Sequence, residues 1–151
     1  MKTRLLFALV GLAIGFALPV LAQEQNTVDP EVRQQIEAVL MKFDDAYNKH
    51  DAAATAALYT QDAVRVLSWE SEGGLASGRQ AIEKKFAVDF ASSPGNASHK
   101  LLQVYAVGNE MSVISEWSAG AFKGYKAFIY VRDADTWKIR LEYAILASEH
   151  R

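Results

Sequence analysis

The C-terminal part of the chain constrains the fold most strongly, because four strand-like segments follow one another on short connections. They cover residues 99–107 (HKLLQVYAV), 111–120 (MSVISEWSAG), 125–132 (YKAFIYVR) and 137–146 (WKIRLEYAIL). The connections GNE, AFKG and DADT are hairpin-sized and rich in turn-forming residues. Parallel neighbours would need a long crossover, so the sequence predicts an antiparallel meander.

Helical patterns come first in the chain. Asp29 is suited to cap a helix that starts at Pro30, and apolar residues recur at helical spacing as far as Tyr47. The segment 48–50 (NKH) ends this helix, and Asp51 is expected to cap a second one that continues to Tyr59.

A strand and a third helix follow. The segment 63–69 (AVRVLSW) alternates like a strand and leads into a glycine-rich loop, 70–78 (ESEGGLASG). Ser77 and Gln80 have the spacing of a capping box for a helix that ends at 92–96 (SSPGN). Helices first and strands later indicate an α+β fold with the helices on one face of the sheet.

The first 22 residues have the three parts of a cleavable secretory signal peptide. Lys2 and Arg4 form the basic region, an apolar run follows, and the small-residue cleavage site ends at Ala22. The apolar run is shorter than the roughly 20 residues that a membrane-spanning helix needs. We therefore expect a signal peptide over 1–22, a short leader over 23–28 and a single domain over 29–151, with the mature protein periplasmic or secreted and without a stable membrane anchor.

The composition and net charge of the chain bear on its possible binding partners. Removing 22 of the 151 residues leaves 129, and it takes two of the 16 basic residues away, leaving 14 against 18 acidic residues and a net charge of −4. This balance argues against nucleic acid as a partner. The chain has no cysteine, so it forms no disulfide and carries no lipid on cysteine.

The order of elements resembles the nuclear transport factor 2-like superfamily. The corner KHDAAATAALYTQDAV (49–64), the opening SGRQAI (77–82) and the final turn and strand DADTWKIRLEY (133–143) are similar to segments of that superfamily. Its SnoaL-like and ketosteroid-isomerase-like branches look closest. The resemblance implies a cone-shaped, curved antiparallel sheet with three N-terminal helices packed on its concave face, a ligand pocket inside the cone, and homodimers formed through the outer sheet face.

The steroid-isomerase mechanism is not expected. The isomerases use a Tyr, a basic Asp and a protonated Asp. The resemblance places these three roles near Phe43, Leu67 (or Trp69) and Phe128, which are all apolar.

Three other residues are candidates for a general base. Glu70 follows Trp69 at the end of a strand, and His99 begins a strand. Trp117 and Glu116 point to opposite faces of the strand 111–120, so Glu116 enters the cone only if the register is the reverse of the one that points Trp117 inward. The alternative for Glu70 and His99 is a solvated position, and the alternative for Glu116 is an outward position on the sheet, toward a partner sheet. The expected pocket wall is Phe43, Tyr47, Leu67, Trp69, Tyr105, Trp117 and Phe128.

The last strand has an apolar alternation. Trp137, Ile139, Leu141, Tyr143 and Ile145 share one face by strict alternation, so Glu142 is expected on the polar outer face with Lys138 and Arg140. No histidine pair has metal-ligand spacing and no glycine-rich phosphate loop is present, so neither a metal nor another cofactor is expected.

Three functions remain open from the sequence. They are binding of a small, largely apolar organic molecule, an enzyme of the isomerase, cyclase or dehydratase type with a pocket acid or histidine as base, and a homodimerisation domain without catalysis.

Overall fold

A computed structural model describes residues 28–70, 74–92 and 95–147. The expected signal peptide and all of the expected leader except Val28 lie outside the described residues. The elements, in chain order, are α1 (Pro30–Asn48), α2 (Ala52–Ala56), β1 (Tyr59–Leu67), β2 (Leu75–Ser77), α3 (Arg79–Ala91), β3 (Ala97–Val107), β4 (Glu110–Ala119), β5 (Phe122–Asp133) and β6 (Thr136–Leu146).

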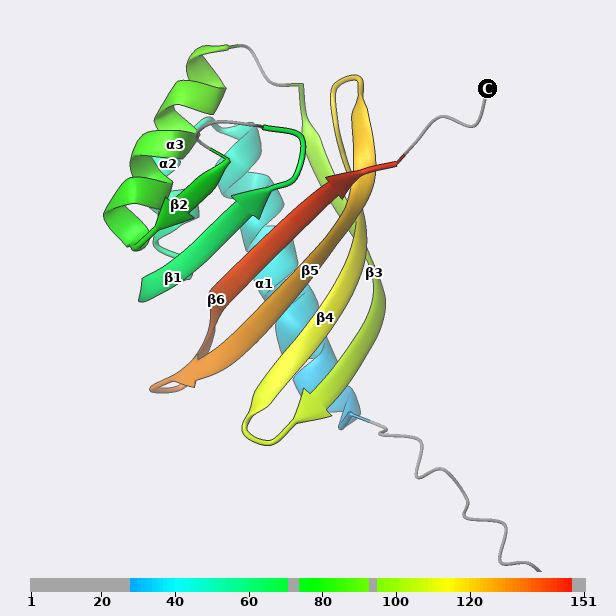
Figure 1. Ribbon diagram of the computed structural model, residues 1–151. Helices are drawn as coiled ribbons and strands as arrows, with labels where there is room; N and C mark the ends of the chain where they lie inside the picture. The colour runs from blue at the N-terminus through cyan, green and yellow to red at the C-terminus, as the bar shows by residue number, and fades with distance from the viewer. Residues whose placement is uncertain (1–27, 71–73, 93–94, 148–151) are drawn as a thin grey trace, which may run out of the picture.

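The strands form one curved sheet in the order β2-β1-β6-β5-β4-β3 (Figure 1). The antiparallel meander β3-β4-β5-β6 and the α+β class are confirmed. The sheet is mixed, however, because β1 runs parallel to β6, so the expectation of a wholly antiparallel sheet is wrong at this pair. A parallel neighbour is possible here because one helix, α3, and four strands, β2 to β5, separate β1 from β6 in the chain.

The helices begin largely where the sequence predicts. The Asp29 carboxylate accepts from the Glu31 N–H at 2.8 Å, and the Asp51 carboxylate accepts from the Ala54 N–H at 2.8 Å. The second helix ends at Ala56, so Tyr59 starts β1 instead of ending α2. The third helix is capped by Gly78 without a side-chain hydrogen bond, since Ser77 belongs to the short strand β2. No helix of the described segments is long and apolar enough to cross a membrane.

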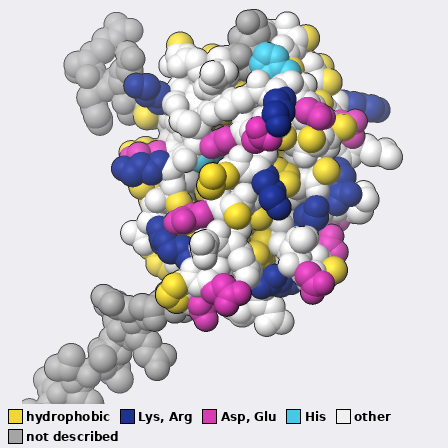
Figure 2. Space-filling view, turned by 180° about the vertical axis from the view of Figure 1, so that it is seen from behind, with side chains coloured by type: hydrophobic (Ala, Val, Ile, Leu, Met, Phe, Trp, Pro, Cys, Tyr) yellow, Lys and Arg dark blue, Asp and Glu magenta, His cyan; other side chains and the backbone are white. Residues whose placement is uncertain are grey.

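The core lies between the concave face of the sheet and the helices. In Figure 1, α1 runs behind β4, β5 and β6, and α2 and α3 lie beside β1 and β2. Buried side chains of α1 and α3, among them Ile36, Phe43 and Phe86, meet Val113, Phe128 and Ile139 of the sheet. Figure 2 shows the face opposite the view of Figure 1, where side chains of both charge signs are interspersed.

A β-bulge in β6 reverses the predicted side of Glu142. Tyr130 pairs with Ile139 and Ile129 pairs with Leu141, so Arg140 is an extra residue in β6. An extra residue shifts the alternation by one, which sends every later side chain to the other face. Trp137 and Ile139, before the bulge, point inward as predicted. After the bulge the inward residues are Glu142 and Ala144, and Tyr143 is 44% exposed. The prediction of Glu142 on the outer face is therefore wrong.

A second bulge, in β3, has the same effect on Tyr105. Leu101 pairs with Ser115 and Gln103 pairs with Ile114, so Leu102 is the extra residue. His99, before the bulge, pairs with the inward Trp117, whereas Tyr105, after it, is 43% exposed. The expectation that Tyr105 lines the pocket is therefore wrong.

Candidate active site

A cavity of about 360 Å³ opens between the sheet, the end of α1 and α3. Its apolar lining includes Tyr47 from α1, Leu67 from β1 and Trp117 from β4, with Trp69 just after β1. Its charged or titratable lining is Arg65, Glu70, Lys85, Asp89, His99 and Lys126. The volume suits a small organic molecule, and such pockets are the usual ligand sites of proteins.

The imidazole of His99 is held by a carboxylate from α1. Nδ1 of His99 lies 2.5 Å from Oδ1 of Asp44, and the His99 backbone N–H donates to Oδ2 of Asp44 at 3.0 Å. A carboxylate only accepts hydrogen bonds, so a neutral His99 carries its proton on Nδ1 and leaves Nε2 with a free lone pair. Nε2 is buried and has no hydrogen-bond partner among the described residues.

His99 is tuned to stay neutral near pH 7. Burial lowers the pKa of His99 below its usual value, and the positive charge of Lys126 lowers it further, while Asp44 acts in the opposite direction. A neutral imidazole with an oriented Nε2 lone pair is the form that a general base requires.

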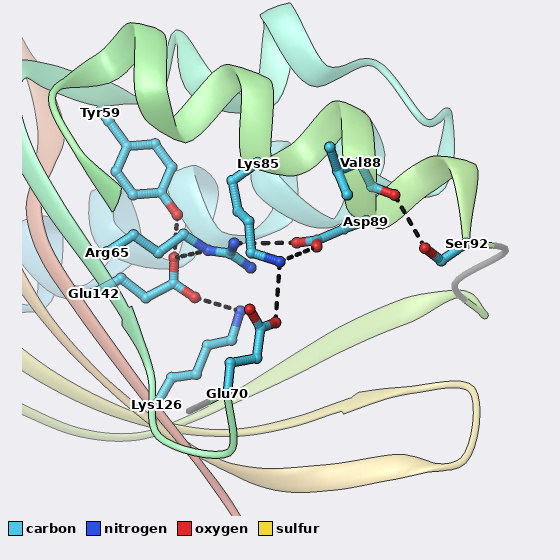
Figure 3. Close-up of polar contacts among 9 residues, drawn as sticks. All are labelled: Tyr59, Arg65, Glu70, Lys85, Val88, Asp89, Ser92, Lys126 and Glu142. Carbon is cyan, nitrogen blue, oxygen red and sulfur yellow. Dashed lines mark hydrogen bonds and ion pairs between the residues drawn. The ribbon is translucent and has the colours of Figure 1, made fainter. Parts of the chain in front are cut away.

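A group of buried charges lies on the inner face of the sheet (Figure 3). Glu142 is fully buried, with one oxygen 3.3 Å from Nε of Arg65 and the other 2.8 Å from Nζ of Lys126. The Tyr59 hydroxyl also donates to Glu142. Burial by itself would raise the pKa of Glu142, but Lys126 and Arg65 lower it to about 2. Glu142 is therefore a permanent anion near pH 7.

A second ion-pair group joins α3 to the end of β1. Lys85 lies 2.5 Å from Oδ1 of Asp89 and 3.0 Å from Oε1 of Glu70. Asp89 also accepts from Arg65 at 3.2 Å, which links this group to the buried one. Burial by itself would lower the pKa of Lys85, but its hydrogen bonds to Asp89 and Glu70 raise this pKa above its usual value.

An aromatic wall faces these charges. The rings of Trp69 and Trp117 are stacked, with centroids 5.5 Å apart and planes at 25°. Nζ of Lys126 lies 5.2 Å from the Trp117 ring, 4.8 Å from the Phe43 ring and 5.9 Å from the Phe128 ring. Aromatic faces attract a cation at these distances.

The family follows from a match over most of the domain. A family model described as the SnoaL-like domain matches residues 40–143, which include α2, α3, strands β1 to β5, most of β6 and both His99 and Glu142. The chain belongs to the SnoaL-like domain family. No curated protein matches it.

Solved structures agree with this SnoaL-like fold. A protein of unknown function with a cystatin-like fold from Nostoc punctiforme is 13% identical, with a TM-score of 0.67, over 81% of this chain and 96% of that one. A ketosteroid isomerase-like protein from Erwinia carotovora atroseptica is 17% identical, with a TM-score of 0.65, over 80% and 99%. An NTF2-like protein of unknown function from Pseudomonas putida is 15% identical, with a TM-score of 0.65, over 78% and 88%. At these identities the likeness concerns the fold.

The SnoaL-like cavity brings together several of the residues named from the sequence. Glu70 and His99 both line it, together with Tyr47, Leu67, Trp69 and Trp117. Phe43 and Phe128 are fully buried beside it and contact the His99 ring, with centroids 5.2 and 6.0 Å away.

Glu116 lies elsewhere. Trp117 is buried and points inward, so its neighbour Glu116 points to the outer face of the sheet. There its side chain is 46% exposed and lies 3.7 Å from Nζ of Lys100. Glu116 therefore cannot act as a base in this cavity.

Most of the charged groups of the site are not among the residues predicted from the sequence. The role of Asp44 could not be predicted, because its partner His99 is 55 residues away in the chain. Arg65 could have been recognised, because it lies two residues before Leu67 and therefore points to the same, core-facing side of the strand. Lys126 could have been recognised in the same way, between Gly124 and Phe128. Glu142 could not, because the bulge at Arg140 places it inside.

Proposed function

We propose that this SnoaL-like domain is an enzyme that moves a proton on a small, largely apolar organic molecule, with His99 as the general base. The observation that carries the proposal is the Asp44–His99 pair. Nδ1 of His99 lies 2.5 Å from Oδ1 of Asp44, and Nε2 of His99 is buried without a hydrogen-bond partner in the described part of the chain. The chemistry is of the kind that isomerases, cyclases and dehydratases share.

The roles of the two residues follow from this geometry. Nε2 takes a proton from a C–H bond of the substrate, and the electron pair of that bond stays on the substrate. Asp44 holds the ring in one tautomer and stabilises the imidazolium that forms. Asp44 is thus a positioning residue and His99 the catalytic one. The apolar residues Phe43, Leu67 and Phe128 at the isomerase positions support a base in a different place.

Solvent hydrogen exchange tests the proposal without knowledge of the natural substrate. We would incubate the mature protein in D₂O with 2-tetralone and with 2-indanone, two flat ketones with exchangeable C–H bonds, and follow deuterium uptake by NMR. We expect uptake faster than in buffer, and a loss of at least about tenfold in His99→Gln, in line with the usual contribution of a general base. His50→Asn is the matched control, because His50 is exposed and Asn tolerates its positive φ of 53°.

The pH profile adds a second readout. The pKa of His99 is lowered from 6.5, so the rate should fall with decreasing pH only below that value. Exchange in His99→Gln equal to that of the wild type, or no exchange above buffer with either ketone, would reject the proposal.

A second function, binding without turnover, is favoured by the stacked wall of Trp69 and Trp117. Native mass spectrometry of protein purified gently from its host checks it. A stoichiometric organic molecule in the wild type that His99→Gln retains, together with no exchange activity, would support a binding protein.

We also propose that the protein is exported, on the support of the signal-peptide pattern over residues 1–22. The intact mass of the protein from its host should correspond to a chain that starts at Gln23. A mass that includes Met1 would contradict export by cleavage.

A further inference from the structure

Lys126 is the least neutralised of the cationic side chains at the cavity. Its side chain is 5% exposed, and Glu142 is its one anionic partner within ion-pair distance among the described residues. Arg65 has two acids, Glu142 and Asp89, and so does Lys85, with Asp89 and Glu70. An ammonium group offers three N–H donors, so Lys126 has donors to spare.

The deepest charges of the cavity are unbalanced as a group. Arg65, Lys126 and Glu142 are all buried, with side-chain exposures of 6%, 5% and 0%. Among the described residues, two cations share the one fully buried anion, and the part-buried Asp89 pairs with Arg65 but not with Lys126. Glu142 also accepts from Tyr59. A buried charge is costly unless it is paired, so a ligand that brings a negative oxygen to this place would gain binding energy.

Lys126 and His99 share their surroundings. The Phe43 ring lies 4.8 Å from Nζ of Lys126 and 5.2 Å from the His99 ring, and the Phe128 ring lies 5.9 and 6.0 Å from them. Trp117, the register partner of His99, lies 5.2 Å from the same Nζ. One small molecule can therefore contact both residues.

We propose that Lys126 binds an anionic oxygen carried by a flat aromatic ligand and so determines which molecules the cavity accepts. The indole wall beside Nζ takes the ring system, and the ammonium group takes the oxygen. The proposal rests on the proposed function for one further step. When His99 removes a proton next to a carbonyl, the C–H electron pair forms a C=C bond, the π pair of the C=O bond moves to the oxygen, and Lys126 pairs with that oxygen until the proton returns to carbon.

Equilibrium dialysis with three probes of one ring system tests the inference. Naphthalene supplies the flat ring alone, 2-naphthoate adds a carboxylate, and 2-naphthol adds an oxygen that ionises on the ring. We expect the wild type to bind at least one of the two oxygen-bearing probes about tenfold more tightly than naphthalene, which corresponds to about 1.4 kcal/mol. If 2-naphthol is the preferred probe, its bound absorption spectrum should shift toward that of the ionised form. The two arms distinguish an oxygen on the ring from a carboxylate.

Lys126→Met should remove most of this preference and leave the affinity for naphthalene within about twofold. It should fold, because Glu142 keeps Arg65 and Tyr59 as partners. Lys126→Gln serves as a second variant if Lys126→Met does not fold. Lys123→Met is the matched control, since Lys123 is exposed on the same strand and points to the opposite face.

Two results would overturn the inference. One is equal affinity of the wild type for all three probes, and the other is a preference that survives in a folded Lys126 variant. Both concern binding and leave the hydrogen-exchange test of His99 unaffected. Conversely, loss of exchange in His99→Gln with full exchange in Lys126→Met would support the proposed function and reject the role of Lys126 in the exchange step alone.

Discussion

Glu142 shows how one side chain can organise a site that it does not line. It is fully buried and contacts Arg65, Lys126 and the Tyr59 hydroxyl. Burying an ion pair gains little over apolar packing, but removing one partner leaves the others as uncompensated buried charges. The cluster is better explained by the position it gives to Lys126 and Arg65 than by a gain in stability.

Glu142→Gln should therefore destabilise the fold by about 3 to 5 kcal/mol, because two buried cations lose their shared anion. Urea unfolding at pH 7 measures this. Glu116→Gln, at an exposed carboxylate, should change the free energy of unfolding by less than about 0.5 kcal/mol. The pKa of Glu142 is lowered to about 2 from 4.5, so its contribution is present above pH 4.5 and is lost as the pH falls toward 2. Equal acid sensitivity in the wild type and Glu142→Gln would contradict this account.

At the scale of elements, the two bulges decide which side chains point to the inner face of the sheet. Leu102 in β3 turns Tyr105 outward, whereas His99, before the bulge, stays inward, and Arg140 in β6 turns Glu142 inward. Each bulge is one extra residue, yet together they account for one pocket residue wrongly predicted and for one charged residue missed. Bulges are common beside active sites because they re-aim side chains in this way.

A single side chain joins the two elements that carry the Asp44–His99 pair. Asn48, at the end of α1, donates to the Ala97 carbonyl at 3.0 Å and accepts from the Ala97 N–H at 2.6 Å, at the start of β3. Four residues before Asn48 is Asp44, and two residues after Ala97 is His99. The link therefore sets the spacing of the proposed base and its partner.

Asn48→Ala should cost about 1 to 3 kcal/mol, because the buried Ala97 loses both backbone hydrogen bonds. Amide hydrogen exchange at the start of β3 should become faster, and proton-transfer activity should fall more than the fraction of folded protein explains. The control is Asn96→Ala at the neighbouring exposed position. Unchanged exchange at residues 97–100 would show that Asn48 does not hold these elements together.

At the scale of the whole molecule, apolar side chains are exposed on the outer face of the sheet. Tyr125, Tyr143 and Ile145 are 44%, 44% and 38% exposed there, on the adjacent strands β5 and β6. Exposed apolar groups on one face favour association, whereas the cavity is lined from within a single chain. We therefore expect a second copy of the chain to cover this face without completing the site.

Sedimentation of the mature protein at micromolar concentration should show a dimer, and Tyr143→Glu should shift it to a monomer by placing a charge in the contact. Met41→Glu is the matched control, because Met41 is 71% exposed on α1, on the other side of the molecule. Ligand binding should remain within about twofold in Tyr143→Glu. A wild-type monomer at this concentration would reject the interface.

The sequence by itself determined the order of the helices and of every strand except β2, which lies in the segment predicted as a loop, together with the caps at Asp29 and Asp51, the hairpins of the meander and the family. These features depend on residues close together in the chain, so they can be recognised from local patterns. Only the tertiary structure decided the parallel pairing of β1 with β6, the two bulges, the contact of Asp44 with His99 and the burial of Glu142 between Arg65 and Lys126. These depend on which strands become neighbours and on where an extra residue is accommodated, and alternation within one strand contains neither.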